Sequence, residues 1–224
     1  MKISSPGWIM LTLLILSQPV AAQVSKGDMV HITELVKRNG THLTGRNLHL
    51  LAAPGYPDAV HLDEGPGSGS LWLEGIRFGE GSIEFDVRGK NLAQQSFVGL
   101  AFHGQSDSVY DVIYFRPFNF LSPDSIRQHH SVQYVSLPQF DWERLRNEFP
   151  GKYEQSVQPA PNPDGWIHAR ICCRSGTISV FVNHQAKPCL VVRQLNDRRD
   201  GEIGFWVGHG SAGDFANLSV STGQ

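Results

Sequence analysis

Three basic side chains in the middle of the chain belong to types that bind or transform a polar ligand: His103, Arg116 and His130. The planar guanidinium of arginine binds carboxylates and hydroxyl groups through several donors, and histidine exchanges protons near neutral pH. Aromatic and amide side chains lie close to them in the sequence, and such groups are typical of the lining of small-molecule sites. We therefore predict a saccharide site in which these three residues are the candidate catalytic groups.

The stretch YDVIYFRPFNF, residues 110–120, is the most informative part of this pattern. It begins as an alternating β-strand and then places an arginine, a proline and an asparagine among aromatic residues. Pro117 has no backbone N–H, so it ends the strand and leaves Arg116 at a strand end, where the guanidinium can reach outward. Asn119 would offer an amide beside it.

Neighbouring strands must then hold these side chains on one face. Side chains alternate along a strand, so residues 97–103, 110–116 and 130–134 can share an open face if they pair as antiparallel strands. The expected core positions of the first two stretches are Val98, Leu100, Phe102, Val109, Ile113 and Phe115. The expected open positions are Gly99, Ala101, His103, Tyr110, Tyr114 and Arg116. On the third stretch, either His130 with Tyr134 or Ser131 with Gln133 joins that face, and periodicity leaves both arrangements open.

The candidate ligand-binding residues combine phenol, amide and indole groups. They are Tyr110, Tyr114, Asn119, Gln133, Tyr134 and Trp142. Three further aromatic residues, Trp166, Phe205 and Trp206, lie within alternating strands and are expected in the core.

A structural interpretation competes with the site. Arg116 could instead pair with Asp111, Asp141 or Glu143 and fix a neighbouring loop to the sheet. The helical spacing of Trp142 likewise favours packing in the core over ligand contact.

Alternating segments dominate the rest of the chain, as in GSIEFDVRG at residues 81–89. One helix is predicted in FDWERLRNEFPG, residues 140–151, with Asp141 as its N-cap. The helix and the Pro-rich segment after it form an insertion of about residues 121–163. We therefore expect an all-β sandwich of two antiparallel sheets with one short helical insertion, and two or three edge strands in residues 23–70.

The first 22 residues have the pattern of a secretory signal peptide, with Lys2 before an apolar run at residues 8–16 and with Val20 and Ala22 before the cleavage point. This run is too short to span a bilayer core of roughly 30 Å. We expect a secreted or periplasmic protein without a membrane span. Residues 23–224 are expected to form one domain and to act as a monomer.

The charge and cysteine content of the chain limit the partners and the disulfides that it is expected to have. The chain has 19 basic and 21 acidic residues without a long charge run, which is not typical of a nucleic-acid-binding protein. The odd cysteine count allows one disulfide at most, between Cys189 and either Cys172 or Cys173. No cofactor is predicted. Calcium bound at a rim of the sandwich is one option, but acidic residues that lie in turns and face solvent are the simpler interpretation. Its ligands would be Asp63, Glu64 and Asp214.

The order of the strand segments carries a resemblance to a known family. From about Leu71 onward the chain reads GSIEFDV, FVGLAFH, DGWIHARI, GTISVFVN and GEIGFWVGHGSAGDFANLSV. In this order the segments resemble a concanavalin A-like jelly roll of the laminin-G and glucanase type, and they are similar to secreted 3-keto-disaccharide hydrolase domains. The resemblance implies the fold more strongly than the function, because this fold hosts lectins, glycosidases, polysaccharide lyases and adhesion modules.

Glu84 and Asp86 have the i, i+2 spacing that retaining glycoside hydrolysis requires of two carboxylates on one strand face. In the family-sixteen glucanases of this fold a further glutamate follows, whereas this chain has Arg88 and Gly89 at those positions. The acid partner is missing, so a solvated outer face is the simpler interpretation of this pair.

We expect an exported domain that binds a carbohydrate on its concave sheet, with glycoside hydrolysis as one option. A polysaccharide lyase is an alternative: Arg116 or Gln133 would neutralise a uronate, His103 or His130 would take the C5 proton, and Tyr114 would act as the acid. A structural or adhesion module is the other alternative, in which the insertion covers the face and no ligand enters.

Overall fold

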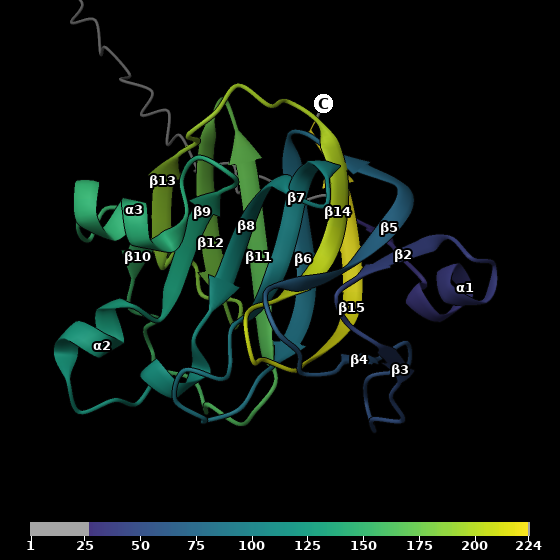
Figure 1. The fold of residues 1–224 in the computed structure, drawn as a ribbon, viewed down its shortest axis with the longest axis horizontal. Helices are drawn as coiled ribbons and strands as arrows, with labels where there is room; N and C mark the ends of the chain where they lie inside the picture. Colours follow the sequence, from purple (N-terminus) through teal and green to yellow (C-terminus); the bar gives the residue numbers. More distant parts are fainter. Residues whose placement is uncertain (1–26, 224) are drawn as a thin grey trace, which may run out of the picture.

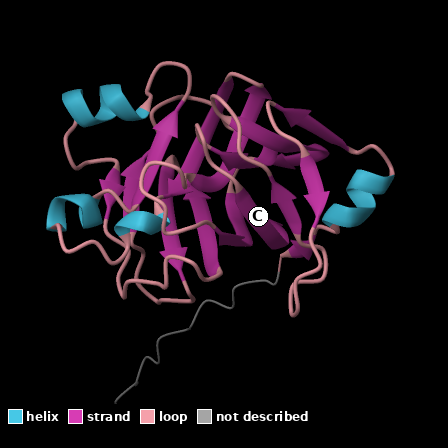
Figure 2. Ribbon diagram, turned by 60° about the horizontal axis from the view of Figure 1, so that its bottom comes forward, coloured by secondary structure: helices cyan, strands magenta, loops and turns pink. Residues whose placement is uncertain are grey.

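Two antiparallel β-sheets pack face to face in the computed structural model, which describes residues 27–223 (Figure 1). Short helices lie toward the ends of the sandwich rather than between the sheets (Figure 2). The predicted all-β sandwich is confirmed. The predicted signal peptide, residues 1–22, lies outside the described residues.

The first sheet has eight strands, and the short strand β1 (Asp28–Met29) joins it by pairing with β15. Phe215 of β15 lies opposite Val87 of β6, so the closing segment of the chain lies in the middle of this sheet. The order of the other strands is β13 (Leu190–Arg193), β12 (Thr177–Val182), β11 (Ile167–Arg174), β6 (Gly81–Arg88), β15 (Gly213–Thr222), β4 (Val60–Leu62) and β3 (Leu48–Leu50).

The second sheet has seven strands and contains the three stretches that were expected to pair. Tyr114 lies opposite both Gly99 and Gln133, which confirms that these stretches are neighbours. The order is β10 (Glu154–Gln155), β9 (Val132–Ser136), β8 (Val109–Phe115), β7 (Val98–Ser106), β14 (Gly201–Val207), β5 (Gly69–Phe78) and β2 (Thr41–Thr44).

The hydrophobic core fills the space between the sheets. Phe205 of the second sheet stacks on Phe215 of the first at 4.6 Å between ring centroids, and both rings are fully buried. Val98, Leu100 and Phe102 are also fully buried, as the alternation predicts. Burial of each such side chain contributes roughly 1.5–3 kcal/mol, so the core fixes which face of each strand points outward.

The predicted helix is α3 (Trp142–Glu148), and the side chain of its N-cap Asp141 accepts a hydrogen bond from the backbone N–H of Arg144. Leu145 is the buried residue of this helix. Trp142 is 50% exposed, so the expectation that it packs in the core is wrong.

Three other short helical segments were not predicted: α1 (Ile32–Lys37), the 3₁₀ helix η1 (Pro117–Asn119) and α2 (Ser125–His129). The sequence gives little periodicity for α2 because none of its side chains is buried. In the N-terminal segment, β2 and β3 form sheet edges as expected. Within residues 27–223, no helix has the length and apolar character needed to cross a membrane.

The three cysteines are free thiols, and burial raises the pKa of Cys173. Two of the three candidate calcium ligands, Asp63 and Asp214, have other partners. Asp63 accepts hydrogen bonds from Asn47, and Asp214 pairs with Arg88. In the described part of the chain, no group of three or more His, Cys, Asp and Glu residues is placed to hold a metal ion.

Glu84 and Asp86 lie on the outer face of the eight-stranded sheet, where both contact His168. Its Nδ1 is 2.8 Å from Asp86 Oδ1, and its Nε2 is 3.1 Å from Glu84 Oε2. Asn217 donates a further hydrogen bond to Asp86 at 2.6 Å. The two carboxylates therefore bind a histidine of their own sheet, and this arrangement leaves no separate acid partner for hydrolysis.

The pKa of His168 is raised by its hydrogen bond to Asp86 and by the charges of both carboxylates, against the opposing effect of burial. The folded state therefore holds the imidazole proton more tightly than the unfolded chain does. This stabilisation is complete below the unfolded-chain pKa of about 6.5 and is lost as the pH rises through the higher folded-state pKa.

We predict that the free energy of unfolding falls more between pH 6 and pH 8.5 in the wild type than in the His168→Asn variant, as measured by urea denaturation. His49→Asn, an exposed histidine of the same sheet, is the control and should keep the wild-type slope. An equal pH dependence in all three proteins would contradict the assignment.

Candidate functional site

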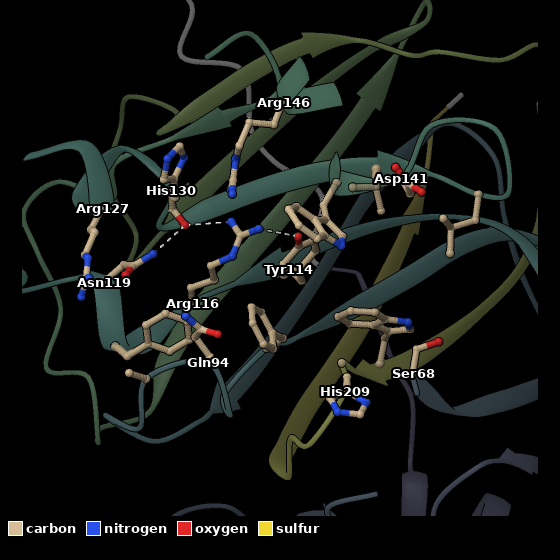
Figure 3. A pocket seen from close by; sticks show the side chains of 18 residues that line it. Ser68, Gln94, Tyr114, Arg116, Asn119, Arg127, His130, Asp141, Arg146 and His209 are labelled. Carbon is tan, nitrogen blue, oxygen red and sulfur yellow. Dashed lines mark hydrogen bonds between the residues drawn. The ribbon is translucent and has the colours of Figure 1, made fainter. Parts of the chain in front are cut away.

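A cavity of about 630 Å³ lies on the outer face of the seven-stranded sheet (Figure 3). Its walls come from the insertion, from the loop before β7 and from the loop after β14. Its lining combines aromatic, cationic and amide side chains, among them Phe97, Tyr114, Arg116, Asn119, Arg127, His130, Trp142, Arg146 and Trp206. The insertion therefore borders this face without filling it.

Tyr114 of β8 and Trp206 of β14 form the floor, with ring centroids 5.2 Å apart. The ring of Phe97 packs edge-on against that of Tyr114, with 6.2 Å between the ring centroids. Gly99 lies between the two strands that carry the floor rings, and a Cβ at this position would come within 2.8 Å of Tyr114 Cβ. A glycine is required here because any larger residue would displace the floor.

Arg116 joins the floor to the insertion. Its Nη1 donates to the His130 carbonyl at 2.9 Å, and its Nη2 donates to the Tyr114 hydroxyl at 2.7 Å. Nη2 also donates to Gln133 Oε1, which accepts a second hydrogen bond from the Tyr114 hydroxyl at 2.7 Å. Asn119 donates to the same His130 carbonyl at 3.2 Å. These hydrogen bonds hold the floor of the pocket and the insertion together.

Glu154 of β10 provides the negative charge beneath this network and is almost fully buried. Arg146 of α3 donates two hydrogen bonds to its carboxylate, at 3.3 and 2.9 Å. His130 Nδ1 lies 2.8 Å from Glu154 Oε1, and Arg116 Nη1 lies 3.8 Å from Oε2. Burial alone would raise the pKa of Glu154, but Arg146, His130 and Arg116 outweigh it and hold that pKa below its usual range.

Burial lowers the pKa of His130, and the charges of Arg146 and Arg116 act in the same direction against the effect of Glu154. A neutral imidazole at this position can accept or donate a hydrogen bond near pH 7. Burial raises the pKa of Tyr114, whose hydroxyl is already shared between Arg116 and Gln133. The phenol is thus a fixed hydrogen-bonding group rather than a free acid.

Most of the predicted site residues gather around this pocket. Tyr114, Arg116, Asn119, His130 and Trp142 line it. Two more lie beside the floor on the same face of the sheet: Gln133 is bonded to Tyr114, and Tyr110 accepts a hydrogen bond from the Trp206 indole at 3.1 Å. Neither alternative left open for the third strand holds as a pair: Gln133 lies opposite Tyr114 in the register, and His130, which precedes β9, lines the pocket in place of Ser131.

His103 and Tyr134 lie on the core side of the sheet, so their expected placement on the open face is wrong. A register shift follows Phe102 in β7, and His103 has a φ of 52°, which turns its side chain inward. Its ring nitrogens contact Asp111 Oδ2 at 2.8 Å and the Gly79 carbonyl at 3.0 Å. Tyr134 donates to the other oxygen of Asp111 at 3.0 Å.

This second polar network is structural. Asp111 is fully buried and also accepts hydrogen bonds from Asn196 at 2.7 Å and Arg198 at 2.8 Å. Burial alone would raise the pKa of Asp111, but His103 and Arg198 outweigh it and lower that pKa. The network fixes the loop before β14 to the inner side of β8 and β9, away from the pocket.

The sequence reasoning missed Trp206, Arg127, Arg146 and Glu154. Trp206 is buried, as expected, but it follows Phe205 in the same strand, so its ring lines the pocket on the outer face of the sheet. Strict alternation could have identified it. Glu154 lies in a strand of two residues, which is too short for a periodic signal.

We predict that Glu154→Gln destabilises the protein by about 3 kcal/mol, because it leaves Arg116 and Arg146 without their buried counter-charge. Urea denaturation at pH 7 measures this loss. Glu148→Gln, which removes an exposed carboxylate bonded to Arg144 on the same helix, is the matched control and should cost less than about 1 kcal/mol. Equal small losses in the two variants would contradict the role of Glu154.

No protein-family model and no curated protein sequence matches the chain at a significant level. Solved structures do match. The carbohydrate-binding module CBM66 from Bacillus subtilis aligns with a TM-score of 0.56 at 11% identity, over 82% of this chain and 94% of the module. A Bacillus subtilis protein of unknown function with a galectin-like fold aligns with a TM-score of 0.58 at 12% identity, over 87% of this chain and 96% of that one.

The calcium-bound exoplasmic or lumenal domain of VIP36 aligns with a TM-score of 0.51 at 12% identity, over 81% of this chain and 85% of that chain. At these identities the likeness concerns the fold. The similarity to 3-keto-disaccharide hydrolase domains stays a prediction. The chain has a concanavalin A-like jelly-roll fold.

Proposed function

We propose that this protein is an exported carbohydrate-binding domain whose site is the pocket on the outer face of the seven-stranded sheet. The observation that carries the proposal is the cavity of about 630 Å³, with an aromatic floor and hydrogen-bonding side chains at one end. Aromatic faces suit the apolar side of a pyranose ring, and the amide, imidazole and guanidinium groups suit its hydroxyls. The carbohydrate-binding module with the same fold supports the same class of ligand.

The walls of the pocket argue against a purely structural module. Trp142 is half exposed at the rim, and the guanidinium of Arg146 lies over its ring, 5.3 Å from the ring centroid. An exposed indole fixed by a neighbouring cation is a typical contact surface for a ligand. The insertion therefore forms a wall of the site rather than a cover over the sheet.

The acidic residues that line the pocket favour binding over hydrolysis, because retaining hydrolysis needs two of them. Among the described residues, Asp141 is the one acidic residue that lines the pocket, and it caps α3. Retaining hydrolysis requires two carboxyl groups roughly 5 Å apart on either side of the bond. Glu84 and Asp86 cannot supply them, since they belong to the other sheet.

A polysaccharide lyase is the second candidate, and His130 is the observation in its favour. The imidazole is partly exposed in the pocket, its Nδ1 lies 2.8 Å from Glu154 Oε1, and its lowered pKa keeps it neutral as a base should be. His103 drops out of this proposal because both of its ring nitrogens have partners in the core. Tyr114 is a weak choice for the acid because its hydroxyl is already shared.

A screen of saccharides that scores binding and product release in the same samples tests the proposal. Binding without release of reducing ends or unsaturated uronate is the expected result. Turnover that disappears in His130→Gln would favour the lyase instead. The absence of binding to every saccharide would contradict both candidates.

We predict that Trp142→Ala weakens saccharide binding about tenfold, because a stacking indole contributes roughly 1 kcal/mol or slightly more. Its unfolding free energy should change little, since the side chain is half exposed. Isothermal titration measures the affinity. Leu50→Ala, an equally exposed apolar residue on the other sheet, is the control and should bind as the wild type does.

A further inference from the structure

The pocket is not uniform, because its positive side chains gather at one end. Arg116 follows β8, Arg127 lies in α2 and Arg146 lies in α3, and all three line the cavity beside His130. Figure 3 shows this group on one side and Asp141 on the opposite side of the pocket. The insertion thus brings three guanidinium groups together from three separate elements.

The acidic residues near this end do not neutralise the positive charge of the three arginines. Glu154 is buried and is shared by Arg146 and Arg116. Asp124, the nearest acid to Arg127, lies 3.7 Å from its Nε and is half exposed, so solvent screens that pair. A charge in the partly buried pocket is screened much less.

Donors remain free for a ligand at this end. Arg146 uses its Nε and Nη2 on Glu154, which leaves Nη1 for another acceptor. Within residues 27–223 the guanidinium of Arg127 makes no hydrogen bond; its Nε lies 3.7 Å from Asp124 Oδ2, and the side chain is 69% exposed. These two groups can therefore bind an anion without breaking a contact of the fold.

The rest of the lining is largely aromatic or aliphatic, with Phe97, Phe118, Trp142 and the floor residue Trp206, and its polar members are Ser68, Gln94, Asn119, Asp141 and His209. A ligand that matches both parts has a ring with an apolar face and an anionic substituent on one side. Arginine pairs with carboxylates and with other oxyanions through two parallel hydrogen bonds, which fixes the orientation of such a group.

We infer that the pocket selects an acidic saccharide, with the carboxylate of a uronate or the sulfate of a sulfated sugar held between Arg127 and Arg146. This inference rests on the proposed function and adds the substrate class to it. Arg116 is the positioning residue, because most of its donors are used to hold Tyr114, Gln133 and the His130 carbonyl.

The test is a titration of the purified protein with matched acidic and neutral saccharides. Oligogalacturonate and its methyl ester differ only at the carboxyl group, which is an anion in the first and an uncharged ester in the second, and dextran sulfate and dextran provide the corresponding sulfate pair. We expect at least one acidic member to bind about tenfold more tightly than its neutral partner, and its affinity to fall as salt is raised from about 50 to about 500 mM. The two pairs distinguish the carboxylate from the sulfate.

Variants of Arg127 separate charge recognition from folding. Arg127→Gln should weaken binding of the acidic saccharide about five- to tenfold. Arg127→Lys should recover part of the loss, because lysine restores the positive charge but not the paired N–H donors of the guanidinium. Binding of neutral saccharides should not change in either variant. Arg38→Gln, which removes an exposed arginine outside the pocket, should leave all affinities unchanged.

Equal or tighter binding of the neutral partners, or an acidic affinity that Arg127→Gln leaves unchanged, would overturn this inference while the proposed function stands. Failure of every saccharide to bind would overturn both. The two failures are therefore distinguishable in one set of titrations.

Discussion

The buried carboxylate of Glu154 holds together the two parts of the molecule that form the pocket. On one side it contacts Arg116, which extends from the end of β8, and on the other it binds Arg146 of α3. A charge this deeply buried is stable only with partners, so the insertion has one position in which its helix faces the sheet. The cavity between them follows from that position.

Much of the fold follows from the sequence because the core imposes strict alternation. Val98, Leu100 and Phe102 are buried as predicted, and Pro117 does end the strand and begin a short 3₁₀ helix. The backbone N–H of Arg116 still donates to Ser131 at 2.8 Å, so the guanidinium leaves the sheet at a fixed point. Strand alternation and the conformational effect of proline were enough to predict these features.

The errors arise where alternation is broken or where distant segments meet. A register shift in β7 turns His103 into the core, and nothing in the residues FVGLAFHG indicates that shift. The choice between Tyr134 and Gln133 depended on how β9 pairs with β8, which periodicity alone does not give. Arg127, Arg146 and Glu154 come together only through the packing of the insertion, so their proximity has no signal in the sequence.

The central claim is that a saccharide binds in the pocket between Trp142 and Trp206. The most direct test follows the indole N–H resonances of the tryptophans by NMR during titration with the tightest saccharide from the screen. The resonances of Trp142 and Trp206 should shift, whereas that of Trp166, which stacks on Tyr56 outside the pocket, should not. A shift confined to Trp166 would contradict the account.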